Sequence, residues 1–409
     1  MNTTASSTVS PVMGDLSRRP AAARSVLRLL DRIEHGALEV QLPDGTQVHC
    51  GPVGAEPRAA MRWHDWQVAQ VCLRRGDIGL AESYIDATWS TPDLPGLLRL
   101  FLNNRPAIER AIYGSWLGSL LARLRHLRNH NSRTGSRRNI HAHYDLGNDF
   151  YARWLDPSMS YSAAWFEGDF EQPLLDAQQA KMTRALNEVR LRPGQRLLEI
   201  GCGWGAMAET AALRGAQVTG LTLSTEQLDW TRDRILRAGL SDRVDLRLQD
   251  YRELHTRPFD AVVSIEMFEA VGERYWPQYF SALARLLKPG GRACIQSITI
   301  REDLFERYRR STDFIQQYIF PGGMLPSVGA FTEAARKAGL VVERQLSFGP
   351  DYAETLRRWR RNFLGASADI AALGFDQRFM RTWEFYLGYC EAAFDADNTD
   401  VVQFTLRRP

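Results

Sequence analysis

The sequence has no apolar run long enough to cross a bilayer, no Cys-x-x-Cys pair and no apolar stretch near its start. A membrane-spanning helix takes about 20 consecutive apolar residues, so none is expected. The five cysteines are widely spaced and fit no recognisable Cys/His zinc pattern. Together with the missing secretory signal, this predicts a cytoplasmic chain with reduced, mostly buried thiols and no metal site.

Acidic residues are missing between positions 121 and 140, where arginines accumulate although the whole chain has a net charge of only +3. The arginines of this basic segment are Arg123, Arg125, Arg128, Arg133, Arg137 and Arg138. Such a run is most often a solvated linker, and it can also bind nucleic acid or anionic phosphate headgroups. Because no nucleic-acid motif accompanies it, we rank headgroups above nucleic acid and expect no nucleic-acid partner.

The length of 409 residues leaves room for two folded domains. Alternating apolar residues on both sides of Pro43-Asp44-Gly45 predict a hairpin of residues 38–42 with 46–50. Thr91, as an N-cap followed by Pro92, predicts the start of a helix. The predicted order is a disordered tail over 1–20, a small α+β domain over 21–125, an Arg-rich linker over 126–140 and a larger domain over 141–409.

Short apolar strands alternate with amphipathic stretches, such as 226–238, in the larger domain. The predicted strands are 196–201, 217–221, 244–248, 259–265 and 292–300. This alternation predicts an α/β fold, with a doubly wound, Rossmann-like parallel sheet beside the smaller N-terminal domain.

The first of these strands runs into a glycine turn. Gly201, Gly203 and Gly205 allow positive φ angles and let a ligand approach the main chain. The spacing is GxGxG rather than the GxGxxG of dinucleotide sites, and an acid, Glu199, precedes it. This combination resembles the first motif of Rossmann-like methyltransferases, although a glycine turn alone would also fit a tight turn without a ligand.

Two further landmarks follow in the order expected for that fold. Gln249-Asp250-Tyr251 follows the third strand, where methyltransferases of this kind hold adenine, and Leu-Lys-Pro-Gly-Gly at 287–291 leads into the fifth strand. Together the three landmarks predict a binding site for the methyl donor S-adenosylmethionine.

Five longer motifs stand out, at residues 143–151 (HYDLGNDFY), 155–162 (LDPSMSYS), 266–272 (EMFEAVG), 318–327 (YIFPGGMLPS) and 348–352 (FGPDY). In this order they resemble the cyclopropane-fatty-acyl-phospholipid synthase family. The likeness runs from about residue 140 to the C-terminus and extends more weakly into residues 75–84.

The resemblance implies methyl transfer from S-adenosylmethionine to the cis double bond of unsaturated acyl chains in membrane phospholipids, with cyclopropane fatty acids as products. It also implies a bound bicarbonate ion, which removes the proton whose loss closes the ring. An alkene is a weak nucleophile, so positioning beside the sulfonium methyl must supply much of the rate. The resemblance implies a homodimer as well. From the basic segment we expect, as a separate hypothesis, that the N-terminal domain docks on lipid and that the protein attaches peripherally to the inner face of the membrane.

Carried over position by position, the resemblance implies a donor site and a bicarbonate site. The donor contacts are Tyr161 and Ser162 for the amino-acid end, Gly201, Gly203 and Gly205 for the close backbone approach, Thr222, Leu223 and Gln227 for the ribose, and Asp250, Tyr251 and Arg252 for the adenine side. The bicarbonate ligands are Glu269 and Tyr352, with Ile298 as a backbone contributor.

Two positions of the implied bicarbonate site depart from the bacterial pattern. Ala163 stands where that pattern has Cys, and Gln296 stands where it has His, although plant-type members are similar at the Gln position. The backbone amide of Ala163 can still donate a hydrogen bond. Gln296 can donate to an oxyanion but can neither carry charge nor shuttle a proton. We predict ring closure, with a methyl or methylene branch as the alternative product.

Two alternatives differ in substrate or in activity. Small-amine N-methyltransferases and sphingolipid C-methyltransferases are similar to the same family, but the N-terminal domain favours a lipid substrate. Ala163 and Gln296 would also fit a non-catalytic protein that binds donor or lipid. The intact donor loop, Glu269 and Tyr352 favour an enzyme.

Charge reversal in the basic segment tests its role. Replacing Arg123, Arg125 and Arg128 by Glu should weaken binding to anionic phospholipid vesicles, and the difference should shrink as salt rises. Vesicle co-sedimentation at low and high ionic strength measures this. Unchanged binding would show that the segment is only a linker.

Overall fold

The computed structural model describes residues 18–107 and 146–409, which form two compact units. Residues 18–107 belong to the first unit together with 377–392, and the second unit contains 146–376 and 393–409. The basic segment and most of the tail lie outside the described residues. The predicted domain boundaries stay a prediction, and the first unit takes in one additional helix from near the C-terminus.

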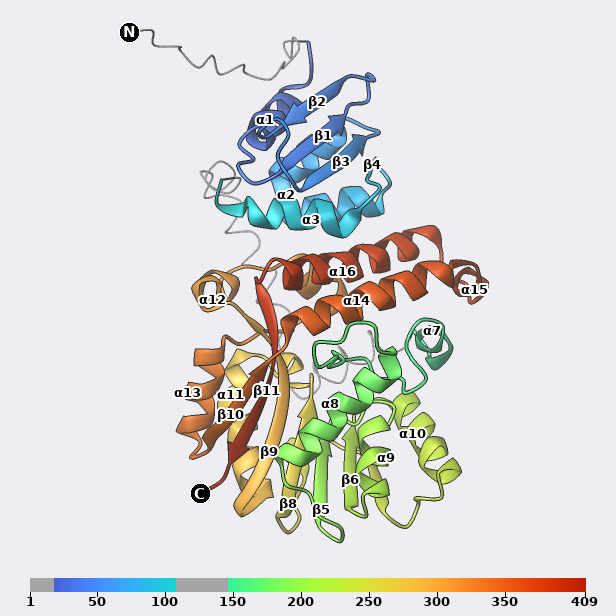
Figure 1. Cartoon of the computed structure of the whole chain (residues 1–409), viewed down its shortest axis with the longest axis vertical. Helices are drawn as coiled ribbons and strands as arrows, with labels where there is room; N and C mark the ends of the chain where they lie inside the picture. Colours follow the sequence, from blue (N-terminus) through green and yellow to red (C-terminus); the bar gives the residue numbers. More distant parts are fainter. Residues whose placement is uncertain (1–17, 108–145) are drawn as a thin grey trace. The chain divides into compact units, whose positions relative to one another are not determined.

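The first unit has a four-stranded sheet with the order β2-β1-β3-β4 and helices around it (Figure 1). Its elements are α1 (Ala21–Leu30), β1 (Ala37–Gln41), β2 (Gln47–Cys50), β3 (Arg58–Trp63), α2 (Gln67–Ile85), β4 (Trp89–Ser90), α3 (Leu94–Asn103) and α16 (Gln377–Asp395). The predicted hairpin is confirmed, because β1 pairs antiparallel with β2. Its turn is closed by the Asp44 carboxylate, which accepts from the Thr46 amide at 2.9 Å.

The predicted start of α3 was wrong by two residues. Asp93, not Thr91, is the N-cap, and its carboxylate accepts from the Gly96 amide at 3.1 Å. Pro95 rather than Pro92 occupies the first turn, where its missing N–H costs nothing. Thr91 instead donates its hydroxyl to the carbonyl of Asp93.

The second unit is built on a seven-stranded sheet with the order β10-β11-β9-β8-β5-β6-β7. Its strands are β5 (Arg196–Ile200), β6 (Gln217–Thr222), β7 (Val244–Leu248), β8 (Phe259–Ile265), β9 (Leu287–Ile300), β10 (Val341–Ser347) and β11 (Thr399–Arg407). Strands β5 to β9 are mutually parallel, as predicted, and β11 joins β9 antiparallel. The predicted α/β fold is confirmed, with β10 and β11 as additional strands.

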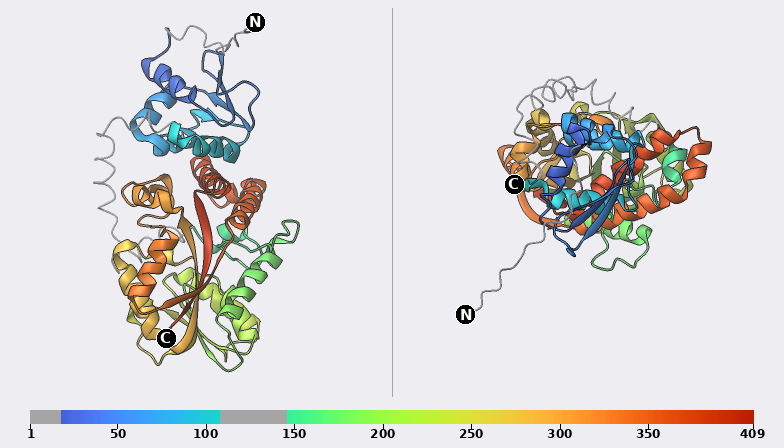
Figure 2. Two further views of the ribbon diagram at one scale, coloured as in Figure 1. Left: turned by 60° about the vertical axis from the view of Figure 1, so that its left-hand side comes forward. Right: turned by 90° about the horizontal axis from the view of Figure 1, so that it is seen from above.

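Helices cover both faces of this sheet (Figure 2). The helices of the second unit are α7 (Asn148–Ala152), α8 (Leu174–Glu188), α9 (Ala206–Leu213), α10 (Thr225–Arg237), α11 (Trp276–Leu286), α12 (Glu302–Tyr308), α13 (Val328–Lys337), α14 (Gly349–Gly365) and α15 (Ser367–Ala372). One core packs aromatic side chains of α11 and α13 on the sheet, with the rings of Phe331 and Phe404 stacked 3.9 Å apart. The other core packs α8 and α9 through small residues such as Ala208 and Ala211. Small residues let these helices lie close to the strands that carry the glycine turn.

Helix α16 is tied to the first unit by Arg381. Its guanidinium donates to the carbonyls of Tyr84 at 2.5 Å and Trp89 at 3.2 Å, and it lies 4.0 Å from the centre of the Tyr84 ring. Arg378, on the same helix, forms an exposed ion pair with Asp86. Among residues 18–107 and 146–409, no helix is long and apolar enough to cross a membrane.

Truncating these two arginines should have different effects on stability. Arg381→Ala should lower the free energy of unfolding by about 1.5–3 kcal/mol, because two carbonyls lose a charged donor. Arg378→Ala, the matched control, should cost less than about 1 kcal/mol, since exposed ion pairs contribute little. Urea unfolding of the full chain measures both. Equal losses would contradict the importance of the Arg381 contacts.

Candidate active site

A pocket lies at the carboxyl ends of β5, β6 and β8, the edge where open α/β sheets bind ligands. Every residue predicted to contact the donor lines it: Tyr161, Ser162, Gly201, Gly203, Gly205, Thr222, Leu223, Gln227, Asp250, Tyr251 and Arg252. The structure therefore brings together residues from four separate stretches of the sequence. Their individual contacts with the donor stay predictions.

The glycine turn between β5 and α9 requires its glycines for two different reasons. Gly205 has φ +87°, and a Cβ there would lie 2.4 Å from the Thr231 side chain. Gly203 has φ +52°, and a Cβ there would meet no atom of the described residues within 4 Å. Gly205 is needed for packing against α10, whereas the open space beside Gly203 belongs to the pocket.

Residues of the 143–151 motif contact the glycine turn and the start of α10. The Asn148 side chain accepts from the indole N–H of Trp204 at 2.7 Å and donates to the Glu226 carbonyl at 3.3 Å. The ring of Tyr151 lies 5.0 Å from that of Trp204. These contacts give the described part of the motif a positioning role at the pocket.

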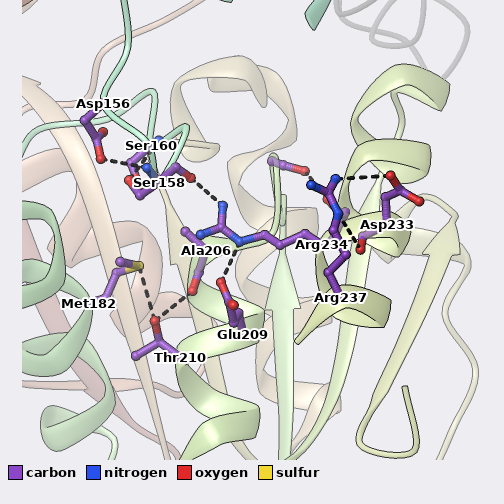
Figure 3. Close-up of polar contacts among 12 residues, drawn as sticks. Asp156, Ser158, Ser160, Met182, Ala206, Glu209, Thr210, Asp233, Arg234 and Arg237 are labelled. Atoms are coloured by element: carbon purple, nitrogen blue, oxygen red, sulfur yellow. Dashed lines mark hydrogen bonds and ion pairs between the residues drawn. The ribbon is translucent and has the colours of Figure 1, made fainter. Parts of the chain in front are cut away.

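Arg234 of α10 fixes the segment that leads to Tyr161 and Ser162 (Figure 3). Its guanidinium donates at 2.6 Å to the Glu209 carboxylate of α9 and at 2.6 Å to the Ser158 carbonyl. Asp156 accepts from the Ser158 amide at 2.8 Å and closes the same loop. The loop, α9 and α10 are thereby joined at one guanidinium.

Several polar side chains that line the pocket form hydrogen bonds or ion pairs with one another. Asp250 binds the Arg252 guanidinium through both oxygens, at 2.5–3.0 Å, so its carboxylate is already committed to a buried ion pair. The Lys181 ammonium donates to the Ser162 hydroxyl at 2.6 Å. Burial lowers the pKa of Lys181 to about 8, although Glu266, Asp156 and Glu199 favour its charged form.

Glu199, which precedes the glycine turn, is buried at the pocket wall. Burial raises its pKa well above the usual range, although the charges of Lys181 and Arg234 lower it in part. Within the described residues, its Oε2 has no hydrogen-bond partner. An acceptor in this position suits a ligand that brings its own donor or positive charge.

Three residues of the implied bicarbonate site also lie together, but they contact Glu266, to which the sequence analysis gave no role. The Glu266 Oε1 accepts from the Ala163 amide at 2.8 Å and from the Gln296 Nε2 at 2.7 Å. Its Oε2 accepts from the Tyr352 hydroxyl at 2.6 Å. Glu266 itself lines the pocket, so this carboxylate belongs to both groups of residues.

Glu269 has separate partners. Its Oε1 accepts from the Ile298 amide at 2.5 Å and from the Ser297 hydroxyl at 3.2 Å, and within the described residues its Oε2 has no partner. Burial and then the charge of Glu266 raise the pKa of Glu269 to about 8. The Tyr352 hydroxyl thus donates to Glu266 and not to Glu269, and a bicarbonate site shared by Glu269 and Tyr352 stays a prediction.

Glu266 could have been found from its position in the sequence. It directly follows β8, and the carboxyl ends of parallel strands are where such folds place functional groups. It also stands within the 266–272 motif, where the family resemblance drew attention to Glu269.

The sequence profile described as "Mycolic acid cyclopropane synthetase" matches residues 131–404. Tuberculostearic acid methyltransferase UfaA1 of Mycobacterium tuberculosis is 40% identical over 97% of this chain and 95% of its own length. Cyclopropane-fatty-acyl-phospholipid synthase of Escherichia coli is 37% identical over 82% of this chain and 84% of its own. The solved structure of mycolic acid cyclopropane synthase CmaA1, complexed with SAH and CTAB, is 34% identical and superimposes with a TM-score of 0.61, covering 66% of this chain and 97% of CmaA1.

A pair of glycine variants tests whether the pocket binds the donor. Gly203→Ala should weaken binding of S-adenosylhomocysteine by about tenfold or more, equivalent to about 1.4 kcal/mol, because its methyl group enters the pocket. Gly194→Ala is the matched control, since Gly194 also has positive φ and open space but does not line the pocket. Isothermal titration calorimetry measures both, and equal affinities would rule out this use of the pocket.

Proposed function

Because the chain belongs to the mycolic acid cyclopropane synthetase family and is an S-adenosylmethionine-dependent methyltransferase, we propose that it methylates the cis double bond of unsaturated acyl chains in membrane phospholipids, giving cyclopropane fatty acids. One observation carries the proposal. The pocket that gathers the predicted donor contacts is also lined by Glu266, whose partners Ala163, Gln296 and Tyr352 come from the predicted catalytic set.

The reaction begins when the alkene π electrons attack the sulfonium methyl. The S–CH₃ bond breaks, S-adenosylhomocysteine leaves, and the second alkene carbon becomes a cation. Loss of a proton from the new methyl lets its C–H electrons form the third ring bond. A hydride shift before this proton loss would give a methylene branch from the same methyl group, so one base serves both outcomes.

Aromatic side chains beside the pocket suit a cationic intermediate. Tyr161 lines the pocket, and its ring lies 5.5 Å from that of Trp154 and 5.4 Å from that of Trp359. The Tyr352 ring lies 6.2 Å from Trp359. Such faces stabilise positive charge and exclude the water that would capture it.

The residues do not fit a bicarbonate ion as the resemblance implied. The Ala163 amide, the Gln296 amide and the Tyr352 hydroxyl all donate to Glu266, and the Ile298 amide donates to Glu269. A bicarbonate ion at this position would lie beside the Glu266 carboxylate and would lack these donors, because they already bind Glu266 or Glu269. No step of the proposed reaction uses bicarbonate.

The first unit supports lipid docking at the membrane surface. A largely apolar pocket lies among α1, α2, α3 and β3, with Leu30, Trp63, Leu98 and Phe101 in its walls. We propose that this pocket holds part of a lipid acyl chain while the protein is peripherally attached to the inner face of the membrane. The homodimer likewise remains part of the proposal.

A methyl-branched product is the second candidate. It is favoured by the similarity to UfaA1, whose name describes a tuberculostearic acid methyltransferase and which matches nearly the whole chain. A saturated branch would need a separate reductant after methylene formation. An amine substrate has no comparable support, and the non-catalytic alternative is set aside because the chain is a methyltransferase.

Labelled donor tests this proposal. Purified protein with S-adenosyl-[methyl-¹⁴C]methionine and vesicles of oleoyl phospholipid should yield labelled lipid, whereas fully saturated vesicles should not. Gas chromatography–mass spectrometry of the fatty-acid esters should show a cyclopropane ring. Branched esters without a ring would establish the second candidate, and donor binding without labelled lipid would overturn both.

A further inference from the structure

Glu266 occupies the centre of a site whose donors come from three different segments. The Ala163 amide precedes α8, Gln296 stands on β9, and Tyr352 stands on α14. All three donate to its carboxylate at 2.6–2.8 Å, the distances of strong charge-assisted hydrogen bonds. Because these are three of the groups expected around a bicarbonate ion, a side-chain carboxylate holds the place predicted for the free anion.

The backbone at Glu266 is held in an unusual conformation to achieve this. Its φ is +49°, in the left-handed region that residues other than glycine rarely adopt. Such a conformation is strained and persists only where the surrounding structure enforces it. Here the preceding strand and the three donors do so, and the turn aims the carboxylate at the pocket.

The neighbouring charges favour one anion in the carboxylate pair. Burial raises the pKa of Glu266, but hydrogen bonds from Tyr352, Ala163 and Gln296 and the positive charge of Lys181 oppose this. Glu269 receives fewer donors, and its pKa near 8 leaves it protonated at neutral pH. Since two like charges destabilise each other in such a pair, we assign the negative charge to Glu266, which accepts hydrogen bonds from three donors.

We propose that Glu266 is the general base of this methyltransferase and replaces bicarbonate with a carboxylate of its own chain. The inference rests on the proposed function. After methyl transfer, a Glu266 oxygen takes a proton from the new methyl, and the C–H electron pair forms the carbon–carbon bond. Glu266 becomes neutral, and its proton passes to solvent before the next turnover. Gln296 and Tyr352 position the carboxylate, which explains why no titratable group is required at position 296.

Two substitutions at one position distinguish this base from a structural carboxylate. Glu266→Gln keeps the shape but removes the basic oxygen, so lipid labelling should fall about hundredfold or more. Glu266→Gly removes the side chain, relieves the positive-φ strain and leaves the three donors open. Its labelling should be equally low in bicarbonate-depleted buffer and should recover in a concentration-dependent way when bicarbonate is added. Wild-type turnover should not depend on bicarbonate.

Direct binding gives a readout that is independent of turnover. In ¹³C NMR titrations, labelled bicarbonate should bind Glu266→Gly but neither the wild type nor Glu266→Gln. All three proteins should bind S-adenosylhomocysteine within about threefold of one another, a difference below about 0.7 kcal/mol. The matched control, Glu306→Gln, changes an exposed acid outside the pocket and should leave labelling unchanged.

The results separate the two proposals. A wild-type enzyme that labels lipid only with bicarbonate, or that binds the labelled ion, overturns the role of Glu266 and leaves the proposed function intact. Lipid labelling by Glu266→Gln at more than a tenth of the wild-type rate also overturns it. If the wild type labels no lipid under any condition, the proposed function fails, while the NMR comparison still shows whether Glu266 occupies the anion site.

Discussion

A half-buried carboxyl group at the end of a strand, that of Glu266, is the constraint on which the active site depends. Glu266 follows β8, and a carboxylate removed from water costs several kcal/mol unless donors compensate. Its donors lie 103, 30 and 86 residues away in the sequence. The loop before α8, strand β9 and helix α14 must therefore meet at one point, and the parallel pairing of β8 with β9 brings Gln296 beside Glu266.

The donor pocket is held by a second set of contacts that converge on the glycine turn. Asn148 binds Trp204, Thr231 packs against Gly205, and Arg234 joins α9 to the loop before Tyr161. A reaction that relies on placing a weak nucleophile beside a sulfonium methyl requires such rigidity, because small displacements lower its rate steeply. The 143–151 motif supports the glycine turn through Asn148 and Tyr151, whereas the 155–162 and 266–272 motifs supply residues that line the pocket itself.

Much of the fold was predictable, because buried parallel strands appear in the sequence as short apolar runs separated by amphipathic helices. All five predicted strands are present, and the glycine turn lies where expected. Strand β10 was missed because its residues are largely exposed and carry no apolar run. The start of α3 was misplaced because Thr91 and Asp93 are both good caps, and only the bond from Gly96 distinguishes them.

The sequence by itself determined the reaction class. The spacing of the glycines, the acid before the glycine turn and the landmarks after it are local features that can be recognised without a structure. It also indicated which residues line the pocket. Only the tertiary structure decided what the residues predicted around bicarbonate bind. Hydrogen-bond partners that are 30 to 103 residues apart in the sequence are set by strand order and helix packing. This packing places Ala163, Gln296 and Tyr352 against Glu266, so their donors are not open to a free ion.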